Sequence, residues 1–353
     1  CQWLCFIKWS RRFIMANLKV DTISGIGTEG PVLNGGLHFR SKNYLTLPKG
    51  DTGQRGGSRA LFGGGYLTPS GYDGGISYLQ MESNGNTIDF GDLSVDRGTP
   101  ASTGSSIRGL WAGGGVPGGV SDVIDYVTIL TTGKAVDFGN LTIARKYFGG
   151  SGSETRGIFS GGDAAPGAAQ LDRIDYVTIA TTGDATDFGN LLSATQHIGS
   201  CSSPTRSVSA GGGTPSLTNV IQYITIATTG DTVNFGDLTA TRKSIDGASS
   251  NTRGLFAAGA TPSLSKSIDF ITIATTGDAA DFGDLITDNQ HYGVASSSIK
   301  AIWAGGYDGS GEGYNLLEFV NIATTGNASD WGDTFRNRKY HAGCSNAHGG
   351  ITQ

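Results

Sequence analysis

Hydrophobic and polar residues alternate in short runs along most of this chain. In the segment RIDYVTIATTG, Ile174, Tyr176 and Thr178 would face one side of an extended strand, and the residues between them would face the other. The Thr-Thr-Gly that ends the run is typical of a tight turn, with a glycine free to adopt positive φ. No window of a dozen residues combines a 3.6-residue period with helix-capping residues. The pattern therefore predicts an all-β fold.

The same pattern returns six times. An Asp-Phe-Gly-like triplet recurs every 47 to 50 residues, with Asn or Trp replacing one member in two copies, starting at Asp89, Asp137, Asp187, Asn234, Asp281 and Asp330. An apolar run ending in small residues keeps the same phase and opens at Arg59, Arg108, Arg156, Arg206, Arg253 and Lys300. A unit of 40 to 50 residues with four short strands is typical of a β-propeller blade. We expect six blades.

The boundaries of the repeat predict how the ring closes. In one copy the strands would be A at 145–153, B at 155–162, C at 173–182 and D at 185–191. The first copy has no clear strand A, whereas the chain ends with RNRKYHAGCSNAHGG (336–350), which resembles one. This C-terminal strand would complete the N-terminal blade and remove the exposed edges of an open array. A right-handed β-solenoid is the alternative, but its coils are usually shorter and need no such exchange.

Composition agrees with this architecture and excludes several classes of protein. Glycine makes up 58 of 353 residues, more than twice the usual share, as expected where strands turn sharply and pack near an axis. The net charge is −5 without a basic stripe, so we expect no nucleic-acid partner. No apolar run approaches 18 residues, so we expect no membrane insertion. The four cysteines are too few and too scattered for a disulfide framework or zinc site, and we expect no cofactor.

The N-terminal part differs from the repeats. Residues 1–14 contain two of the four cysteines and are basic, and Met15 follows them, so we interpret 1–14 as a non-native upstream segment with Met15 as the start. A membrane-surface amphipathic arm is the minority interpretation. Residues 15–50 would be an attachment segment, and 51–353 the six-bladed propeller.

Motifs that could carry catalysis have structural explanations. The Asp-Phe-Gly triplet of kinases binds magnesium, but six copies at one repeat phase indicate blade structure, with the aromatic packed between blades. His197 and His291 occupy equivalent positions, which we expect to lie blades apart, too far to share a metal ion. Segment 94–99 partly resembles a sialidase Asp-box but occurs once, and glycosidases need two carboxylates about 5–9.5 Å apart. We expect no enzymatic activity and assign no catalytic or metal-binding residue.

The connection between strands B and C varies most among the copies. Variation in a surface loop fits either neutral drift or recognition. Ring closure would bring the first and last blades together, and their loops contain a set of tyrosines and acids: Tyr66, Tyr72, Asp73, Tyr307, Asp308, Glu312 and Tyr314. Tyrosine faces can stack on sugar rings while carboxylates accept hydrogen bonds from hydroxyl groups. These seven residues are our candidate glycan-binding patch.

The repeat resembles two groups of proteins. The apolar strand ending in Gly-Gly, followed by spaced aromatics such as Tyr176 and Phe188, resembles the kelch blade, although kelch usually has Trp where five copies have Phe. The phrases GLFAAG and IDFITIATTG and the segment 17–27 look like kelch-type structural proteins of tailed phages from marine and cyanobacterial hosts. This second resemblance implies a virion component, such as a tail fibre or surface decoration, made in the host cytoplasm.

The expected function follows from that resemblance. It implies a non-enzymatic protein that contacts other virion proteins through residues 15–50 and presents a propeller face to a host-surface glycan or protein. Two alternatives remain open. One is a cellular kelch-type module for protein interaction, and the other is a carbohydrate-active propeller enzyme.

Overall fold

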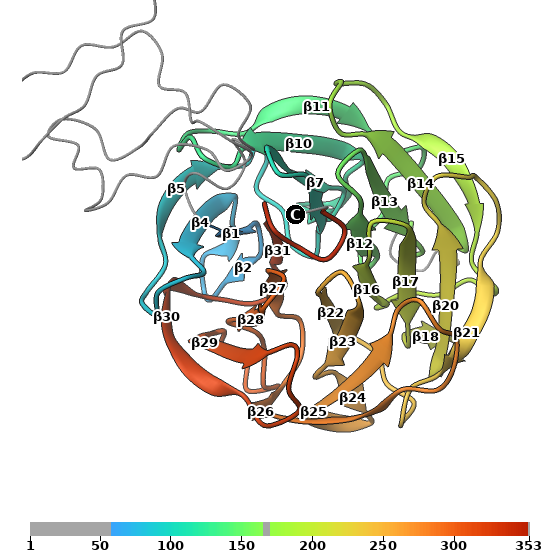
Figure 1. Cartoon of the computed structure of the whole chain (residues 1–353). Coiled ribbons are helices and arrows are strands. Elements are labelled where there is room, and N and C mark those ends of the chain that lie inside the picture. Colours follow the sequence, from blue (N-terminus) through green and yellow to red (C-terminus); the bar gives the residue numbers. More distant parts are fainter. Residues whose placement is uncertain (1–57, 165–169, 352–353) are drawn as a thin grey trace, which may run out of the picture. The chain divides into compact units, whose positions relative to one another are not determined.

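The protein folds as a six-bladed β-propeller, as its repeats predict. The computed structural model describes residues 58–164 and 170–351, so the predicted segments 1–14 and 15–50 lie outside the described residues. Six antiparallel sheets surround a common centre, and each contributes its shortest strand to that centre (Figure 1). No helix among the described residues is long and apolar enough to cross a membrane.

Each blade has four main strands, ordered A to D from the centre outward. Blades 1 to 3 consist of β31 (Ala342–Ser345), β1 (Arg59–Gly63), β4 (Gly75–Gln80) and β5 (Ile88–Asp92); β6 (Ala101–Gly104), β7 (Arg108–Ala112), β10 (Val123–Thr128) and β11 (Val136–Asn140); and β12 (Gly149–Gly152), β13 (Arg156–Ser160), β14 (Arg173–Thr178) and β15 (Thr186–Asn190).

Blades 4 to 6 repeat this order, with longer outer strands in the last two. They consist of β16 (Gly199–Ser202), β17 (Arg206–Ala210), β20 (Val220–Thr225) and β21 (Val233–Asp237); β22 (Asp246–Ser249), β23 (Arg253–Ala257), β25 (Ser263–Thr272) and β26 (Ala280–Asn289); and β27 (Gly293–Ser296), β28 (Lys300–Ala304), β29 (Tyr314–Asn321) and β30 (Ser329–Arg338).

The variable B–C connections add short strands on one face of the propeller. They are β2 (Tyr66–Leu67) with β3 (Gly71–Tyr72), β8 (Gly115–Val116) with β9 (Gly119–Val120), β18 (Gly213–Thr214) with β19 (Ser216–Leu217), and β24 (Ala260–Thr261) with the start of β25. We call this side the loop face.

The C-terminal strand closes the ring, which confirms the prediction. β31 pairs with β1 in antiparallel register, with Ser345 opposite Ala60 and Ala342 opposite Gly63. The A strands are shorter than predicted, however. β12 begins at Gly149 rather than 145, because Arg145 turns its guanidinium into the interior and Tyr147 adopts a φ of +59° that an extended strand cannot accommodate.

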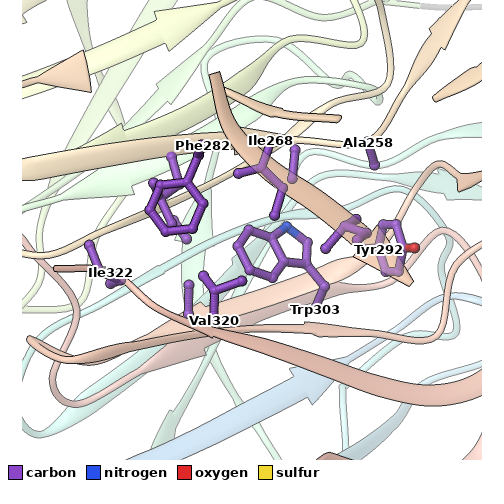
Figure 2. Close-up of a cluster of buried hydrophobic side chains, with 12 residues drawn as sticks. Ala258, Ile268, Phe282, Tyr292, Trp303, Val320 and Ile322 are labelled. Atoms are coloured by element: carbon purple, nitrogen blue, oxygen red, sulfur yellow. The ribbon is translucent and has the colours of Figure 1, made fainter. Parts of the chain in front are cut away.

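The hydrophobic core lies between blades rather than inside one sheet. Trp303 of blade 6 packs among Ile268 and Phe282 of blade 5 and Val320 and Ile322 of its own blade (Figure 2). The aromatic of the repeated triplet occupies the same kind of seam, as predicted. Each blade therefore depends on its neighbours for burial of its apolar faces.

Two polar contacts recur at these seams. In one, Gly183 in a C–D turn donates its N–H to the carbonyl of Phe138 in the preceding blade at 2.7 Å. In the other, Arg156 stacks on Tyr176 at 4.8 Å from the ring centroid and donates from Nη1 to the carbonyl of Ile226 in the next blade at 2.7 Å. The recurring glycine, aromatic and arginine of the sequence thus hold adjacent blades in phase.

The residues that follow β31 lie near the centre of the ring (Figure 1), where His348 lines a cavity surrounded by the A strands of all six blades. After β31 the side chain of His348 lies with Nε2 2.8 Å from the carbonyl oxygen of Gly104. A side chain on Gly349 would collide with the carbonyl of Ser250, and one on Gly350 would collide with that of Gly152. Only glycine fits this close approach, which covers the mouth opposite the loop face.

Candidate functional site

The other mouth of the channel is surrounded by one residue from each connection between blades. These six residues, which we call the axial ring, are Thr99, Tyr147, His197, Ser244, His291 and Tyr340. Although none is glycine, all have φ between +53° and +60°. Left-handed backbone at a non-glycine residue is uncommon and persists where its surroundings impose it.

Hydrogen bonds between ring members impose that backbone. The N–H of His197 donates to the carbonyl of Tyr147 at 2.7 Å, and the N–H of Ser244 donates to the carbonyl of His197 at 2.9 Å. Across the closure point, the N–H of Thr99 donates to the carbonyl of Tyr340 at 2.6 Å. These bonds join Tyr147, His197 and Ser244 on one side of the ring and link Thr99 to Tyr340 on the other.

The aromatic side chains of the axial ring stack on one another. The ring centroids of Tyr147 and His197 are 4.0 Å apart, those of His291 and Tyr340 are 4.4 Å apart, and the two imidazoles are 5.3 Å apart. The expectation that His197 and His291 lie blades apart is therefore wrong. Equivalent residues on a connection meet because all six connections converge on the axis.

Burial keeps both imidazoles neutral. It lowers the pKa of His197 to about 3, helped by the positive charges of Lys243 and Lys146, and it lowers the pKa of His291 well below its usual value. Ser244 Oγ lies 3.2 Å from His197 Nδ1 and fixes its orientation. No group of three His, Cys, Asp or Glu side chains in residues 58–164 and 170–351 is arranged to hold a metal ion.

Beside the axial ring, the loop face contains an open pocket of about 200 Å³. We call it the tyrosine pocket; its lining consists of Tyr66, Tyr72, Gly98, Thr99, Gly115, Lys146, Tyr147 and Tyr340. Four tyrosines from three parts of the chain surround it, and no carboxylate is among these lining residues. The pocket offers aromatic faces, hydroxyl groups and one ammonium group.

The first blade supplies two of these tyrosines from a hairpin. Tyr66 and Tyr72 face each other across β2 and β3, with ring centroids 5.6 Å apart in an edge-to-face arrangement. The N–H of Tyr66 donates to the carbonyl of Lys339 at 2.8 Å, which joins the hairpin to the last connection. Thr68 Oγ1 donates to the carbonyl of Gly311 in blade 6 at 3.0 Å. The first and last blades do bring their loops together, as the closed ring implies.

The structure separates the seven residues of the predicted patch. Tyr66 and Tyr72 line the tyrosine pocket, and Tyr307 lies at its border, with its ring centroid 5.8 Å from that of Tyr340. Tyr314 is not among the lining residues, and its hydroxyl donates to Asp308 Oδ2 at 2.7 Å.

The three acids of the predicted patch have different surroundings. Asp73 is buried and pairs with Arg336 at 3.1 Å and Arg338 at 3.3 Å. Asp308 accepts hydrogen bonds from the hydroxyl and the N–H of Ser310 and from the Tyr314 hydroxyl, and these bonds lower its pKa. Glu312 is exposed at the tip of its loop. Asp73 and Asp308 thus already serve intramolecular partners.

Sequence reasoning missed the residues contributed by the connections. Lys146, Tyr147 and Tyr340 lie in connections between blades, outside the variable B–C loops that contain the predicted patch. The available signal was that four of six copies carry an aromatic or imidazole side chain at the axial-ring position.

Other hollows in the described residues have structural explanations. A wider one of about 330 Å³ lies beside Phe235 and Gly277, the triplet aromatic and turn glycine that meet at every seam. Narrow cavities of about 50 to 80 Å³ lie along the axis; the smallest is lined largely by small residues of the A strands, and one of about 60 Å³ lies directly beneath the axial ring, whose six residues all line it. A scan against models of known protein families finds no match to the sequence, and a comparison with curated proteins finds no significant relative.

Proposed function

We propose that this protein is a non-catalytic binding module that captures a glycan in the tyrosine pocket of its loop face. The observation that carries the proposal is the convergence of Tyr66, Tyr72, Tyr147 and Tyr340 on one open pocket. Aromatic faces stack on the C–H groups of pyranose rings, and phenol hydroxyls exchange hydrogen bonds with sugar hydroxyls. The lining lacks the pair of carboxylates that glycoside hydrolysis usually uses, which favours binding over turnover.

The tyrosines are held ready for a ligand. Burial raises the pKa of Tyr340 to about 12, and burial together with Tyr72 and Asp163 raises that of Tyr147. Both hydroxyls therefore keep their protons at neutral pH. Edge-to-face contact between Tyr66 and Tyr72 fixes those rings before binding, which lowers the entropic cost of ordering them.

The proposal includes the setting suggested by the sequence. The protein would be part of a phage particle, anchored to other virion proteins by residues 15–50, and the loop face would meet the host surface. Mass spectrometry of purified particles tests this setting independently of the ligand. A cellular interaction module would instead be found in cells and absent from particles.

The binding test is a glycan array with the wild type and single tyrosine variants. Tyr72→Ala and Tyr147→Ala should each weaken binding by about tenfold, since an aromatic contact contributes about 0.5–1.5 kcal/mol beyond its buried area. Tyr314→Ala is the matched control, because its ring is outside the lining. Thermal melts should show that all variants remain folded. No binding by the wild type, or equal binding by all variants, would overturn the proposal.

A further inference from the structure

Lysines surround the centre of the loop face in a regular arrangement. The residue before each axial-ring member pairs with a B–C loop, and these six residues are Gly98, Lys146, Gln196, Lys243, Gln290 and Lys339. Lysine therefore occupies every second connection around the axis. The three lysines concentrate positive charge around the axis on the loop face, although the protein as a whole has a net charge of −5.

Two of these lysines adjoin the tyrosine pocket. Lys146 lines it, with Nζ 5.0 Å from the centroid of the Tyr147 ring. Lys339 is not a lining residue, but it adjoins the pocket: its Nζ is 4.6 Å from the centroid of the Tyr307 ring and 5.5 Å from that of the Tyr66 ring. Lys339 is buried, donates to the carbonyl of Gly311 and forms no ion pair within the described part of the chain.

The pocket consequently has an excess of donors. Its charged side chain is an ammonium group, the phenols of Tyr147 and Tyr340 remain protonated, and no carboxylate lines it. The backbone of Asp163 pairs with that of Lys146, but Asp163 is not among the lining residues, so a neutral sugar would offer the Lys146 ammonium no anionic group within the pocket. A ligand that carries a negative group beside a pyranose ring would satisfy both the ammonium and the aromatic faces.

We propose that the tyrosine pocket selects an acidic sugar, whose anionic group pairs with Lys146 while its ring stacks on the surrounding tyrosines. This inference rests on the proposed glycan binding and specifies its ligand class. The anionic group could be the carboxylate of a uronic acid or a sulfate ester, and the test separates these two sources.

The test compares oligosaccharides that differ only in charge. Titration calorimetry with the full chain would use β-1,4-linked mannuronate tetrasaccharide, the matching neutral mannotetraose and a 6-sulfated mannotetraose. We expect an acidic ligand to bind about tenfold more tightly than the neutral one, with affinity falling as salt is raised. The acidic ligand that binds more tightly identifies the anionic group.

Variants assign the preference to one side chain. Lys146→Gln should remove the tenfold preference, so that the acidic and the neutral ligand bind this variant with about equal affinity. Lys243→Gln is the matched control, since it belongs to the same set of lysines but does not line the pocket. It should change the preference by no more than about twofold, because its effect is long-range and screened.

The outcomes distinguish this inference from the function it rests on. Tyrosine-dependent binding of neutral and acidic ligands with equal affinity, or a preference that survives Lys146→Gln, would overturn the acidic selectivity and leave glycan binding in place. Failure of all three ligands, together with a negative glycan array, would overturn both.

Discussion

Arg242 Nη2 lies 2.7 Å from Asp269 Oδ2, with both side chains completely or almost completely buried. Equivalent pairs link Arg97 to Asp125 and Arg145 to Asp175. Each arginine lies in a connection between two blades. Its guanidinium donates hydrogen bonds to backbone carbonyls of the following blade and forms an ion pair with an aspartate on strand C of that blade. These pairs fix the connections that form the axial ring.

One blade has uncharged residues at both positions of this buried ion pair. In blade 4, Thr195 replaces the arginine and Gln222 replaces the aspartate. Gln222 Oε1 accepts hydrogen bonds from the Leu192 N–H and from Thr232 Oγ1, each at 2.8 Å. The protein therefore contains a natural neutral substitute for its own buried ion pair.

This substitute allows a swap experiment. Arg242→Thr alone should lower the free energy of unfolding by about 3–5 kcal/mol, because it leaves the Asp269 carboxylate buried without its cation. The triple change Arg242→Thr, Asp269→Gln and Ala279→Thr copies blade 4 and should recover most of that loss. Urea unfolding measures both. A triple variant no more stable than the single one would show that the pairs are not interchangeable.

Removal of the closing strand should disrupt the whole ring. Truncation after Tyr340 deletes β31, exposes the edge of β1 and removes the carbonyl of Ala342 that accepts from Trp111 Nε1 at 3.1 Å. We expect a broad, low-temperature melt by circular dichroism, with recovery on addition of a peptide of residues 341–353. A chain lacking only residues 352–353 is the control. An unchanged melting temperature after the larger deletion would contradict closure by this strand.

Two glycines at one seam should respond differently to alanine. Gly139 has a φ of +146° and a side chain there would collide with the carbonyl of Gly183, whereas Gly183 has a φ of +156° and open space around it. Both changes should lose about 1–3 kcal/mol from backbone strain. Gly139→Ala should lose about 1–3 kcal/mol more from overpacking. Equal losses in denaturant unfolding would show that the seam can relax.

The channel contains a carboxylate that should make stability depend on pH. Asp246 begins β22 where the other blades have glycine or alanine, and burial raises its pKa to about 8, opposed by the Tyr292 N–H that it accepts at 3.0 Å. The folded protein then keeps a proton that the unfolded chain loses above its ordinary pKa of 3.8. The stability supplied by this group is therefore present at low pH and lost as pH rises to about 8.

Asp246→Asn should remove that dependence. Asparagine accepts the same hydrogen bond without ionising, so the variant should melt at a higher temperature than the wild type at pH 9 and close to it at pH 4. Scanning calorimetry across this range provides the measurement. Parallel pH profiles for the two proteins would show that Asp246 ionises freely in the folded state.

The sequence by itself determined the number of blades, the all-β class and the closure of the ring. It could do so because every blade makes the same contacts with its neighbour. The aromatic at Phe188, the turn glycine at Gly183 and the arginine at Arg156 therefore return at one phase in the copies. The first copy lacks strand A and the C-terminal segment supplies one, and this exchange predicts that the ring closes through the C-terminal strand.

Only the tertiary structure decided which residues meet at the axis and in the tyrosine pocket. His197 and His291 are 94 residues apart in the sequence, and their rings meet because the six connections between blades converge on the axis. No local sequence pattern contains this long-range contact. Asp73 shows the same limit. Ser77 occupies the strand C position at which three other blades have an aspartate. Arg338 therefore forms its ion pair with Asp73 instead, and Asp73 is buried. Local alternation sets strands and phase, whereas long-range packing determines which polar side chains remain free to bind a ligand.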